Sequence, residues 1–257
     1  MAILSLTSVS KSFDGLKAVD NLSLAIEEGK ITALIGPNGS GKTTVFNIVT
    51  GLLKADAGEI AMDSRKLTGL PPYKIARAGI GRTFQLIRLC PQMSVLDNVM
   101  LALRYPIGEK LSMAMLRPKR LVREEEANQK RAIELLTRVE MDHKQEAMGS
   151  DLSHGQRRLV EIARALALDP KVLLLDEPMS GLFPKMIEKS MEIIRGLRDE
   201  GRTIWFIEHN MRVVLELSDR VIVLDHGRKL AEGTPEEIRG NPEVNTAYLG
   251  RSRTGAA

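Results

Sequence analysis

The chain has 257 residues, of which 43% are hydrophobic, and this is enough to build the core of one large domain or two small ones. Its 37 lysines and arginines and 33 aspartates and glutamates leave a formal net charge of +4, which is too small to indicate a nucleic-acid partner. The single cysteine, Cys90, cannot form an internal disulfide, so we expect a reducing, cytosolic compartment.

The N-terminal segment MAILSLTSVSKSFDGL lacks a basic region followed by a sustained apolar run, so no secretory signal is expected. No apolar run in the chain approaches about 18 residues, the shortest that crosses a bilayer as a helix. A role at a membrane would therefore require a partner that holds the chain there.

Short runs of Val, Ile and Leu alternate with helical patterns, which is typical of a parallel sheet covered by helices. Three nearly continuous apolar runs, at residues 31–35, 172–175 and 204–207, predict strands that are buried on both faces. The expected fold class is therefore α/β.

Helices are predicted over residues 43–52, 156–168 and 184–200, in the intervals between these strands. Near the C-terminus, the capping box TPEE at residues 234–237 and the Asn-Pro pair at 241–242 each predict the start of a short helix. The final RSRTGAA is predicted to be a frayed tail.

The segment from residue 94 to residue 148 has helical patterns and no convincing strand, and we interpret it as a helical subdomain inserted into the α/β core. Its densely charged run at residues 117–131 fits a solvated helix face. Contact of this run with lipid headgroups or with a membrane subunit is the alternative.

The sequence GPNGSGKT matches the P-loop pattern and lies between an apolar strand and a helical segment, which is the context that this motif requires. Its backbone N–H groups and the helix N-terminus would cradle phosphate oxygens. Lys42 would reach the β- and γ-phosphates, and the Thr43 hydroxyl would bind Mg²⁺. The residues expected to bind nucleotide here are Gly36, Pro37, Asn38, Gly39, Ser40, Gly41, Lys42, Thr43 and Thr44.

The sequence VLLLDEP places two carboxylates at the end of a buried strand. Asp176 there suits the holding of Mg²⁺, directly or through water. Glu177 would lie near the γ-phosphate and could polarise the attacking water as a general base.

The sequence LSHGQ precedes these carboxylates and leads into a helix. In one interpretation Ser153 is only a helix cap beside a flexible Gly155. In the other, the Ser153 hydroxyl, the Gly155 N–H and the helix N-terminus form a second phosphate-binding edge. Such an edge, if far from the P-loop, would serve the nucleotide of another copy of the protein.

In this order and spacing the motifs resemble those of the nucleotide-binding subunits of ATP-binding cassette (ABC) transporters, with LSHGQ in the place of their signature motif. The resemblance adds Ser153, Gly155 and Gln156 as contacts to ATP across a dimer. It also implies that Gln85 touches Mg²⁺ and the attacking water, that His209 contacts the γ-phosphate, and that Phe13 stacks on adenine. Taken singly, these three residues would be an exposed glutamine, a loop histidine and a core aromatic.

The resemblance implies a P-loop NTPase fold with a mostly parallel core sheet, an antiparallel β subdomain and an inserted α-helical subdomain. The expected core is formed by residues 1–93 and 169–233, the helical subdomain by 94–168, and C-terminal helices and a tail by 234–257. The implied catalytic residues are Glu177, His209, Gln85 and Lys42; the implied ligands of Mg²⁺ are Thr43, Gln85 and Asp176.

Several segments, among them GLPPYKIARAGIGRTFQLIRL, residues 105–120 and the ending GTPEEIRGNPEVNTAYLG, resemble the ATPases of branched-chain amino-acid importers. Relatives of that subfamily serve urea, amides and small organic acids. Two positions depart from the family: His154 replaces a glycine of the signature, and Phe183 replaces the usual Asp or Asn of the D-loop. Phe183 suggests pairing with a non-identical ATPase.

The expected protein is an ATP- and Mg²⁺-dependent motor at the cytoplasmic face of the membrane, where it is peripheral. Its expected partners are permease subunits, a second ABC ATPase or a second copy, and indirectly an external solute-binding protein, with no nucleic acid. A soluble ABC ATPase acting on ribosomes or DNA is disfavoured, because those chains carry two cassettes or long coiled-coil insertions. An exporter ATPase for lipid or lipopolysaccharide would share the same chemistry.

Overall fold

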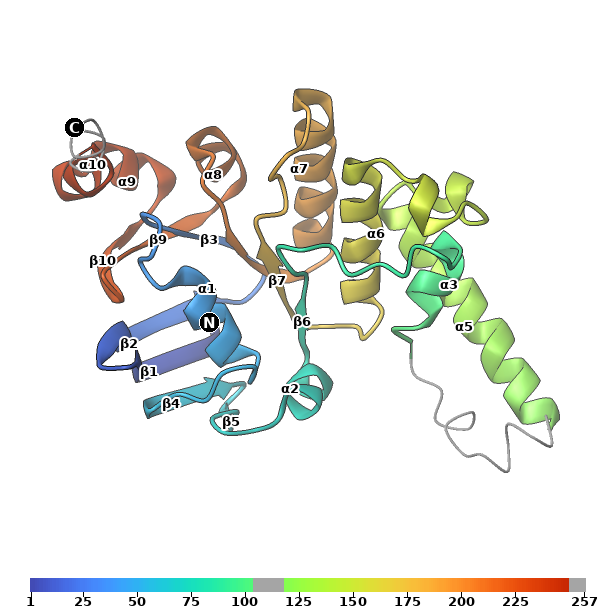
Figure 1. Cartoon of the computed structure of the whole chain (residues 1–257), viewed down its shortest axis with the longest axis horizontal. Coiled ribbons are helices and arrows are strands. Elements are labelled where there is room, and N and C mark those ends of the chain that lie inside the picture. The colour runs from blue at the N-terminus through green and yellow to red at the C-terminus, as the bar shows by residue number, and fades with distance from the viewer. Residues whose placement is uncertain (104–117, 250–257) are drawn as a thin grey trace.

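A computed structural model describes residues 1–103 and 118–249, and their strands form two sheets (Figure 1). The larger sheet has the order β10-β9-β3-β8-β7-β6, and the smaller has the order β2-β1-β4-β5. Within the described part of the larger sheet, β10 pairs antiparallel with β9 and all other pairs are parallel. The smaller sheet is antiparallel. The predicted α/β class, with a mostly parallel core sheet and an antiparallel β subdomain, is confirmed.

The strands of the larger sheet are β3 (Ile31–Ile35), β6 (Ile80–Arg82), β7 (Val172–Asp176), β8 (Thr203–Ile207), β9 (Arg220–Asp225) and β10 (Arg228–Gly233). Those of the smaller sheet are β1 (Ala2–Phe13), β2 (Leu16–Glu27), β4 (Ala57–Met62) and β5 (Arg65–Lys66). The helices are α1 (Lys42–Val49), α2 (Pro72–Ala78), α3 (Val95–Met100), α5 (Lys119–Arg138), α6 (His154–Leu166), α7 (Pro184–Asp199), α8 (Met211–Leu217), α9 (Pro235–Gly240) and α10 (Pro242–Leu249).

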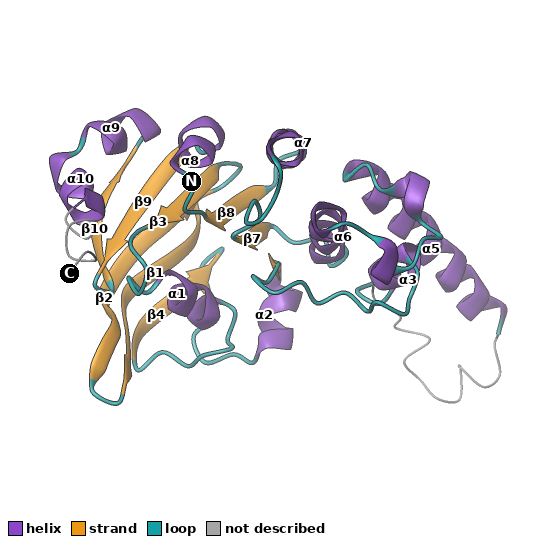
Figure 2. Cartoon of the chain, turned by 45° about the horizontal axis from the view of Figure 1, so that its top comes forward, coloured by secondary structure: helices purple, strands orange, loops and turns teal. Residues whose placement is uncertain are grey.

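The larger sheet separates two hydrophobic cores, because successive side chains of a strand point to opposite faces. On β8, Ile204 and Phe206 pack into the core shared with α6, α7 and α8. Trp205 and Ile207 pack into the core shared with α1 and the smaller sheet. Figure 2 shows α1 beside the smaller sheet, whereas α7 and α8 lie across the larger one.

The single tryptophan, Trp205, is fully buried at the centre of the larger sheet. Its ring meets that of Phe46, on α1, edge to face, with ring centroids 5.0 Å apart. The helix that follows the P-loop motif is therefore packed directly on the middle of the sheet.

The helix predicted over residues 43–52 ends earlier, at Val49, and the predicted end was wrong. The Thr50 hydroxyl donates to the Phe46 carbonyl, and Gly51 then takes a left-handed conformation at φ 73°. A glycine in that conformation stops a helix.

The helix predicted from residue 156 begins instead at His154, because Ser153 is its N-cap, and ends at Leu166 rather than at residue 168. The helix predicted to end at residue 200 ends at Asp199.

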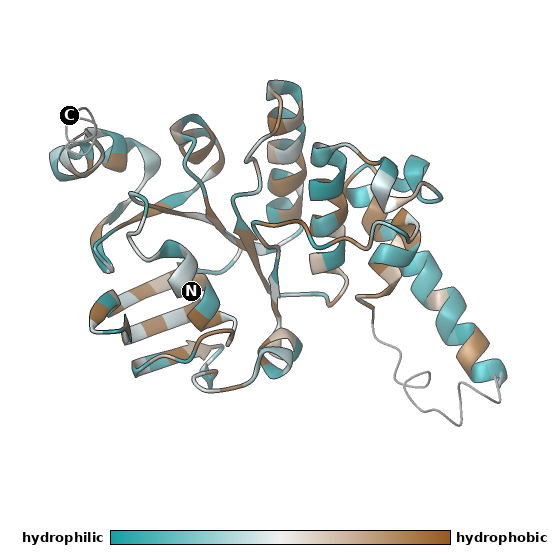
Figure 3. Ribbon diagram, viewed as in Figure 1, coloured by the Kyte–Doolittle hydropathy of each residue, from teal (hydrophilic) through white to brown (hydrophobic). Residues whose placement is uncertain are grey.

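The helical insertion predicted over residues 94–148 contains α3, α5 and a short 3-10 turn at Asp142–Lys144, and no strand within its described residues. A second 3-10 turn, Gly149–Asp151, follows it. Residues 105–117 of the segment 105–120, which resembles the importer ATPases, lie outside the described residues, as does the predicted frayed tail. The rest of the charged run lies on α5, where Leu121 is buried and most other side chains are exposed. Figure 3 shows α5 as largely hydrophilic. Within the described chain, no helix is both long enough and apolar enough to cross a bilayer.

Candidate functional site

The P-loop motif forms a tight turn between the carboxyl end of β3 and the start of α1. A Cβ atom at Gly36 would overlap the Leu224 carbonyl oxygen, and one at Gly41 would overlap the Ala18 carbonyl oxygen. Glycine is therefore required at both positions by the close approach of the neighbouring backbone. Gly41 is also the N-cap of α1, with a left-handed φ of 101°.

Lys42 is the first residue of α1 and is only 6% exposed. Its ammonium donates to the carbonyl oxygens of Gly36 (2.9 Å) and Pro37 (3.0 Å). Burial lowers the pKa of Lys42, whereas the charges of Glu177 and Asp176 oppose that shift. The loop thus holds a partly desolvated cation that phosphate oxygens could approach.

One cleft of about 350 Å³ gathers most of the residues that the sequence predicts to bind nucleotide. It brings the P-loop motif together with side chains from the end of β1, the segment after β6 and the ends of β7 and β8. The predicted residues that line it are Phe13, Asn38, Gly39, Gly41, Lys42, Thr43, Thr44, Gln85, Glu177 and His209. The remaining P-loop residues, Gly36, Pro37 and Ser40, are buried behind it.

Glu177 lines the cleft and contacts two of its other lining residues. Its carboxylate accepts a hydrogen bond from Gln85 Nε2 at 3.1 Å and contacts His209 Nε2 at 3.0 Å. Its backbone has φ 49°, a left-handed conformation that costs a non-glycine residue on the order of 1–3 kcal/mol. Such strain is maintained only where the surroundings hold the residue, here through the Glu177 N–H bond to the Ile207 carbonyl at 3.0 Å.

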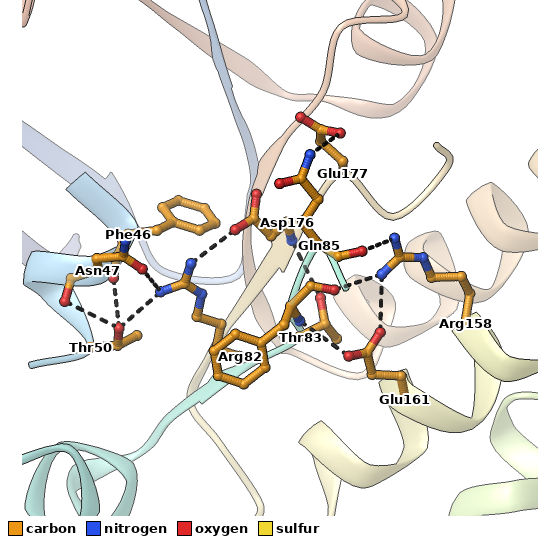
Figure 4. Close-up of polar contacts among 11 residues, drawn as sticks. Phe46, Asn47, Thr50, Arg82, Thr83, Gln85, Arg158, Glu161, Asp176 and Glu177 are labelled. Carbon is orange, nitrogen blue, oxygen red and sulfur yellow. Dashed lines mark hydrogen bonds and ion pairs between the residues drawn. The ribbon is translucent and has the colours of Figure 1, made fainter. Parts of the chain in front are cut away.

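Asp176 is the last residue of β7 and is 2% exposed. Its Oδ2 atom accepts a hydrogen bond from Arg82, on β6, at 2.9 Å (Figure 4). Its Oδ1 atom is buried and has no hydrogen-bond partner among the described residues.

Mg²⁺ prefers oxygen ligands and keeps several waters while it binds substrate phosphates, so a protein supplies it with few ligands. Within the described chain there is no cluster of three or more His, Cys, Asp or Glu residues suited to a metal. The Thr43 hydroxyl lines the cleft, whereas Asp176 is buried and is not among the residues that line it. The unpartnered Oδ1 of Asp176 and the Thr43 hydroxyl are oxygen ligands of the kind that a nucleotide-bound Mg²⁺ accepts. Gln85, the third predicted ligand, also lines the cleft.

Phe13 ends β1 at the rim of the cleft and is 43% exposed. The Lys11 ammonium lies 5.5 Å from the centroid of its ring. An exposed aromatic ring at the rim of a cleft that the P-loop motif lines offers a stacking surface to a base.

The LSHGQ segment lies at the start of α6, and of the described residues that line the cleft none belongs to it. Ser153 and Gln156 form a complete capping box: Ser153 Oγ accepts from the Gln156 N–H, and Gln156 Oε1 accepts from the Ser153 N–H. Ser153 is therefore the N-cap of α6, as the first interpretation predicts, and the capping box does not test the second. If this segment also forms a second phosphate-binding edge, the nucleotide that it contacts must lie outside this cleft.

Sequence reasoning missed several polar residues that hold the site in place. Glu208 is 4% exposed, and its carboxylate accepts from the backbone N–H groups of Met179, His209 and Asn210. Arg158 on α6 donates to the carbonyl oxygens of Phe84 and Gln85. The sequence gives only a weak signal for Glu208, which is a charged residue directly between a predicted strand and a predicted site residue. It gives no such signal for Arg158.

A family model described as "ABC transporter" matches residues 19–180. The chain belongs to the ABC transporter family. A second model, described as "Branched-chain amino acid ATP-binding cassette transporter", matches residues 228–253 of the cassette. The cassette is an ATPase, as its family and its ATP-binding relatives indicate.

The cassette is 42% identical over 251 residues to LivG of Salmonella typhimurium, a high-affinity branched-chain amino acid transport ATP-binding protein, covering 97% of the chain and 98% of the relative. It is 38% identical, with the same coverage, to the corresponding protein BraF of Pseudomonas aeruginosa. It is also 38% identical over 250 residues to LptB of Escherichia coli, a lipopolysaccharide export system ATP-binding protein, again covering 97% and 98%.

Solved structures agree with this assignment. A nucleotide-free ATP-binding cassette from an ABC transporter superposes with a TM-score of 0.85 at 33% identity, covering 96% of this chain and 99% of that one. The ADP conformation of an ABC transporter cassette gives 0.84 at 33% identity, covering 97% and 99%. A dimeric post-hydrolysis cassette bound to ADP and Pi gives 0.75 at 32% identity, covering 90% and 98%.

Proposed function

We propose that this cassette is the ATP-hydrolysing subunit of an importer for branched-chain or other small amino acids, bound peripherally at the cytoplasmic face of the membrane. The observation that carries the proposal is the contact of the Glu177 carboxylate with Gln85 and His209 in the cleft that the P-loop motif lines. A carboxylate held there can orient and polarise a water for attack on the γ-phosphate of ATP.

The roles of the other cleft residues follow from their chemistry. The N–H groups of the P-loop and the Lys42 ammonium bind the phosphates, and Phe13 stacks on the adenine. Asp176, Thr43 and Gln85 would hold Mg²⁺, which neutralises charge on the phosphates when bound. His209 donates to a γ-phosphate oxygen as charge moves onto the phosphate group.

A second cassette completes the site in this proposal. Ser153, Gly155 and Gln156 lie away from their own cleft, so they serve the nucleotide of a partner cassette, and ATP then lies between the two subunits. The dimeric solved relative supports this arrangement. The partner in this proposal is a non-identical cassette, whose D-loop supplies the polar group that the exposed Phe183 replaces here.

The substrate class rests on the similar proteins and on the C-terminal segment. LivG and BraF are both branched-chain amino acid transport proteins, and the branched-chain family model matches residues 228–253. Lipopolysaccharide export is the second candidate, favoured by the identity to LptB. Importers of urea, amides or small organic acids share the motifs of the amino-acid importers.

The first experiment is recovery of the tagged full-length chain from mildly solubilised native membranes, followed by mass spectrometry of its partners. We expect two permease subunits and a second short cassette. Recovery of lipopolysaccharide export components would favour the second candidate. Recovery of ribosomes or DNA-repair factors without a permease would overturn the transport assignment and leave the ATPase chemistry intact.

The second experiment identifies the solute. The recovered complex, reconstituted in vesicles with its solute-binding protein, should take up labelled leucine, isoleucine or valine when ATP is supplied at the cassette side. Uptake of urea or an amide, with none of leucine, would replace the proposed substrate. The same vesicles with Glu177→Gln cassettes provide the control for passive leakage.

A further inference from the structure

Arg82 is the last residue of β6, at the edge of the larger sheet, and its side chain is only 6% exposed. It lies between three parts of the site: β7, which carries Asp176, the helix α1 that follows the P-loop, and the segment that leads to Gln85 (Figure 4). Neither the motifs nor the charge pattern of the sequence singled it out.

The two terminal nitrogens of Arg82 have different partners. Nη2 donates to Asp176 Oδ2 at 2.9 Å. Nη1 donates to Asn47 Oδ1 at 2.8 Å and to Thr50 Oγ1 at 3.1 Å, both near the end of α1. The guanidinium is therefore fixed on the P-loop helix by one nitrogen and on Asp176 by the other.

Two aromatic rings lie beside this guanidinium. Its central carbon lies 5.6 Å from the ring centroid of Phe46 and 5.1 Å from that of Phe84. Cations at such distances are attracted by the faces of aromatic rings. Because Phe84 directly precedes Gln85, the same contacts connect the metal-binding carboxylate with the glutamine segment.

Stability alone is a weak reason for this arrangement. A buried ion pair often contributes no more than apolar residues of similar volume, because both charges lose their hydration. The pair instead determines which oxygen of Asp176 is free: Oδ2 is bound to Arg82, while the buried Oδ1 has no partner among the described residues.

We propose that Arg82 is a positioning residue for Asp176, which it orients so that Oδ1 remains available to nucleotide-bound Mg²⁺ or to its water. The inference rests on the proposed function, in which Asp176 serves that metal. Thr83 supports the same alignment, because its hydroxyl accepts from the Asp176 N–H at 3.3 Å. Arg82 itself does not line the nucleotide cleft and touches no reacting atom in this proposal.

The test measures metal binding rather than turnover. Mn²⁺ affinity is measured by electron paramagnetic resonance with a non-hydrolysable ATP analogue, and analogue affinity is measured separately in EDTA. Arg82→Met should weaken Mn²⁺ binding by about tenfold or more while analogue affinity in EDTA stays within about twofold. If Arg82 acted only through its charge, Arg82→Met would instead bind Mn²⁺ more tightly, because removing a positive charge beside a metal site strengthens metal binding.

Three further variants make the result specific. Arg82→Lys keeps the charge but cannot make both sets of hydrogen bonds, so its Mn²⁺ affinity should fall less than that of Arg82→Met. Arg77→Met is the matched control, because Arg77 is exposed and lies over the ring of Tyr73, 5.8 Å from its centroid. It should bind Mn²⁺ as the unmodified cassette does. Asp176→Asn tests the role of the carboxylate itself.

The outcomes separate the two proposals. Normal Mn²⁺ binding by Arg82→Met, with binding lost in Asp176→Asn, overturns the role of Arg82 and leaves the proposed function standing. Normal Mn²⁺ binding by Asp176→Asn overturns the metal role on which both depend. Circular dichroism checks that Arg82→Met is folded. If it is not, the Mn²⁺ affinity of Arg82→Lys is compared with that of Arg77→Met, and equal affinities overturn the inference.

Discussion

Glu177 combines a left-handed backbone with two side-chain contacts in the nucleotide cleft, to Gln85 and His209. A glutamine there would keep the size of the side chain and still accept hydrogen bonds, but it could not take a proton from water. The residue therefore offers a substitution that separates chemistry from binding.

We predict that Glu177→Gln binds ATP with an affinity within a few-fold of that of the unmodified chain, while its turnover falls by about 10²–10⁴-fold. Steady-state phosphate release and equilibrium binding of a fluorescent ATP analogue measure the two quantities. The same variant should be trapped by ATP as a dimer when its partner cassette is present. Turnover equal to that of the unmodified chain would remove Glu177 from the catalytic role.

Lys42 supplies the positive charge of the P-loop from a nearly buried position. Lys42→Ala should weaken ATP binding by about 10–100-fold, the effect of removing one or two hydrogen bonds to a charged group. Titration calorimetry with ATP and Mg²⁺ measures this loss. Unchanged affinity would contradict the assignment of the loop as a phosphate cradle, and a melting curve checks that the variant is folded.

At the scale of elements, residues 1–103 and 118–249 contain two complete capping boxes, Ser153 with Gln156 at α6 and Thr234 with Glu237 at α9. Neither helix lines the nucleotide cleft of its own chain, but only the first is proposed to contact the nucleotide of a partner cassette. The second is therefore a matched control for the first.

Ser153→Ala and Thr234→Ala should each lower the free energy of unfolding by about 1 kcal/mol, since each removes an N-cap oxygen. Only Ser153→Ala should also abolish ATP-dependent association of the cassette with its partner and lower turnover. Urea unfolding and gel filtration with ATP measure the two effects. If both variants associated with the partner equally well in the presence of ATP, Ser153 would act only as a helix cap.

The sequence predicted three strands of the larger sheet, β3, β7 and β8, to within a residue, because continuous apolar runs leave few alternatives. The buried strand β9 and the short strand β6 were not predicted. The long strands β1 and β2 were not delimited, and their register shifts, such as that between Leu6 and Val9, break the alternation that reveals a half-buried strand. Helix ends were displaced where a hydroxyl or a glycine decided them, as at Thr50 and Gly51.

The site residues within motifs could be predicted because their types and spacing are required by phosphate chemistry. The role of Arg82 could not be predicted, since an arginine at the end of a short strand matches no motif. Its importance comes from partners far away in the chain, at Asn47 and Asp176. The same holds for Arg158, which contacts backbone atoms of Phe84 and Gln85 that carry no sequence signal.

For the whole molecule, the question is which second cassette completes the site. Phe183 is 82% exposed and lies directly before α7, in the segment that follows Glu177. Phe183 is the N-cap of α7 and makes no side-chain cap hydrogen bond, so an aspartate there would stabilise the folded cassette by about 1 kcal/mol. That gain acts within one cassette and not between two. Any effect of substitution at this position on association therefore reports on the interface.

We predict that Phe183→Asp, introduced with Glu177→Gln, increases ATP-dependent self-association of the isolated cassette, because it restores a polar D-loop residue. Light scattering after gel filtration measures the mass with and without ATP. Tyr73→Asp, on the exposed face of α2, controls for the added charge. Self-association that is equally strong before and after the change at Phe183 would contradict pairing with a non-identical cassette.

The edge-to-face contact between Phe46 and Trp205 makes the intrinsic tryptophan fluorescence of the protein a probe of α1. As the chain has a single tryptophan, its emission comes from one buried ring, and that ring touches the helix on which the phosphates of ATP would rest. A small rotation of α1 on nucleotide binding would change the packing around this indole and shift its emission. Binding, and later the opening and closing of the motor, could thus be followed in real time with the unlabelled protein.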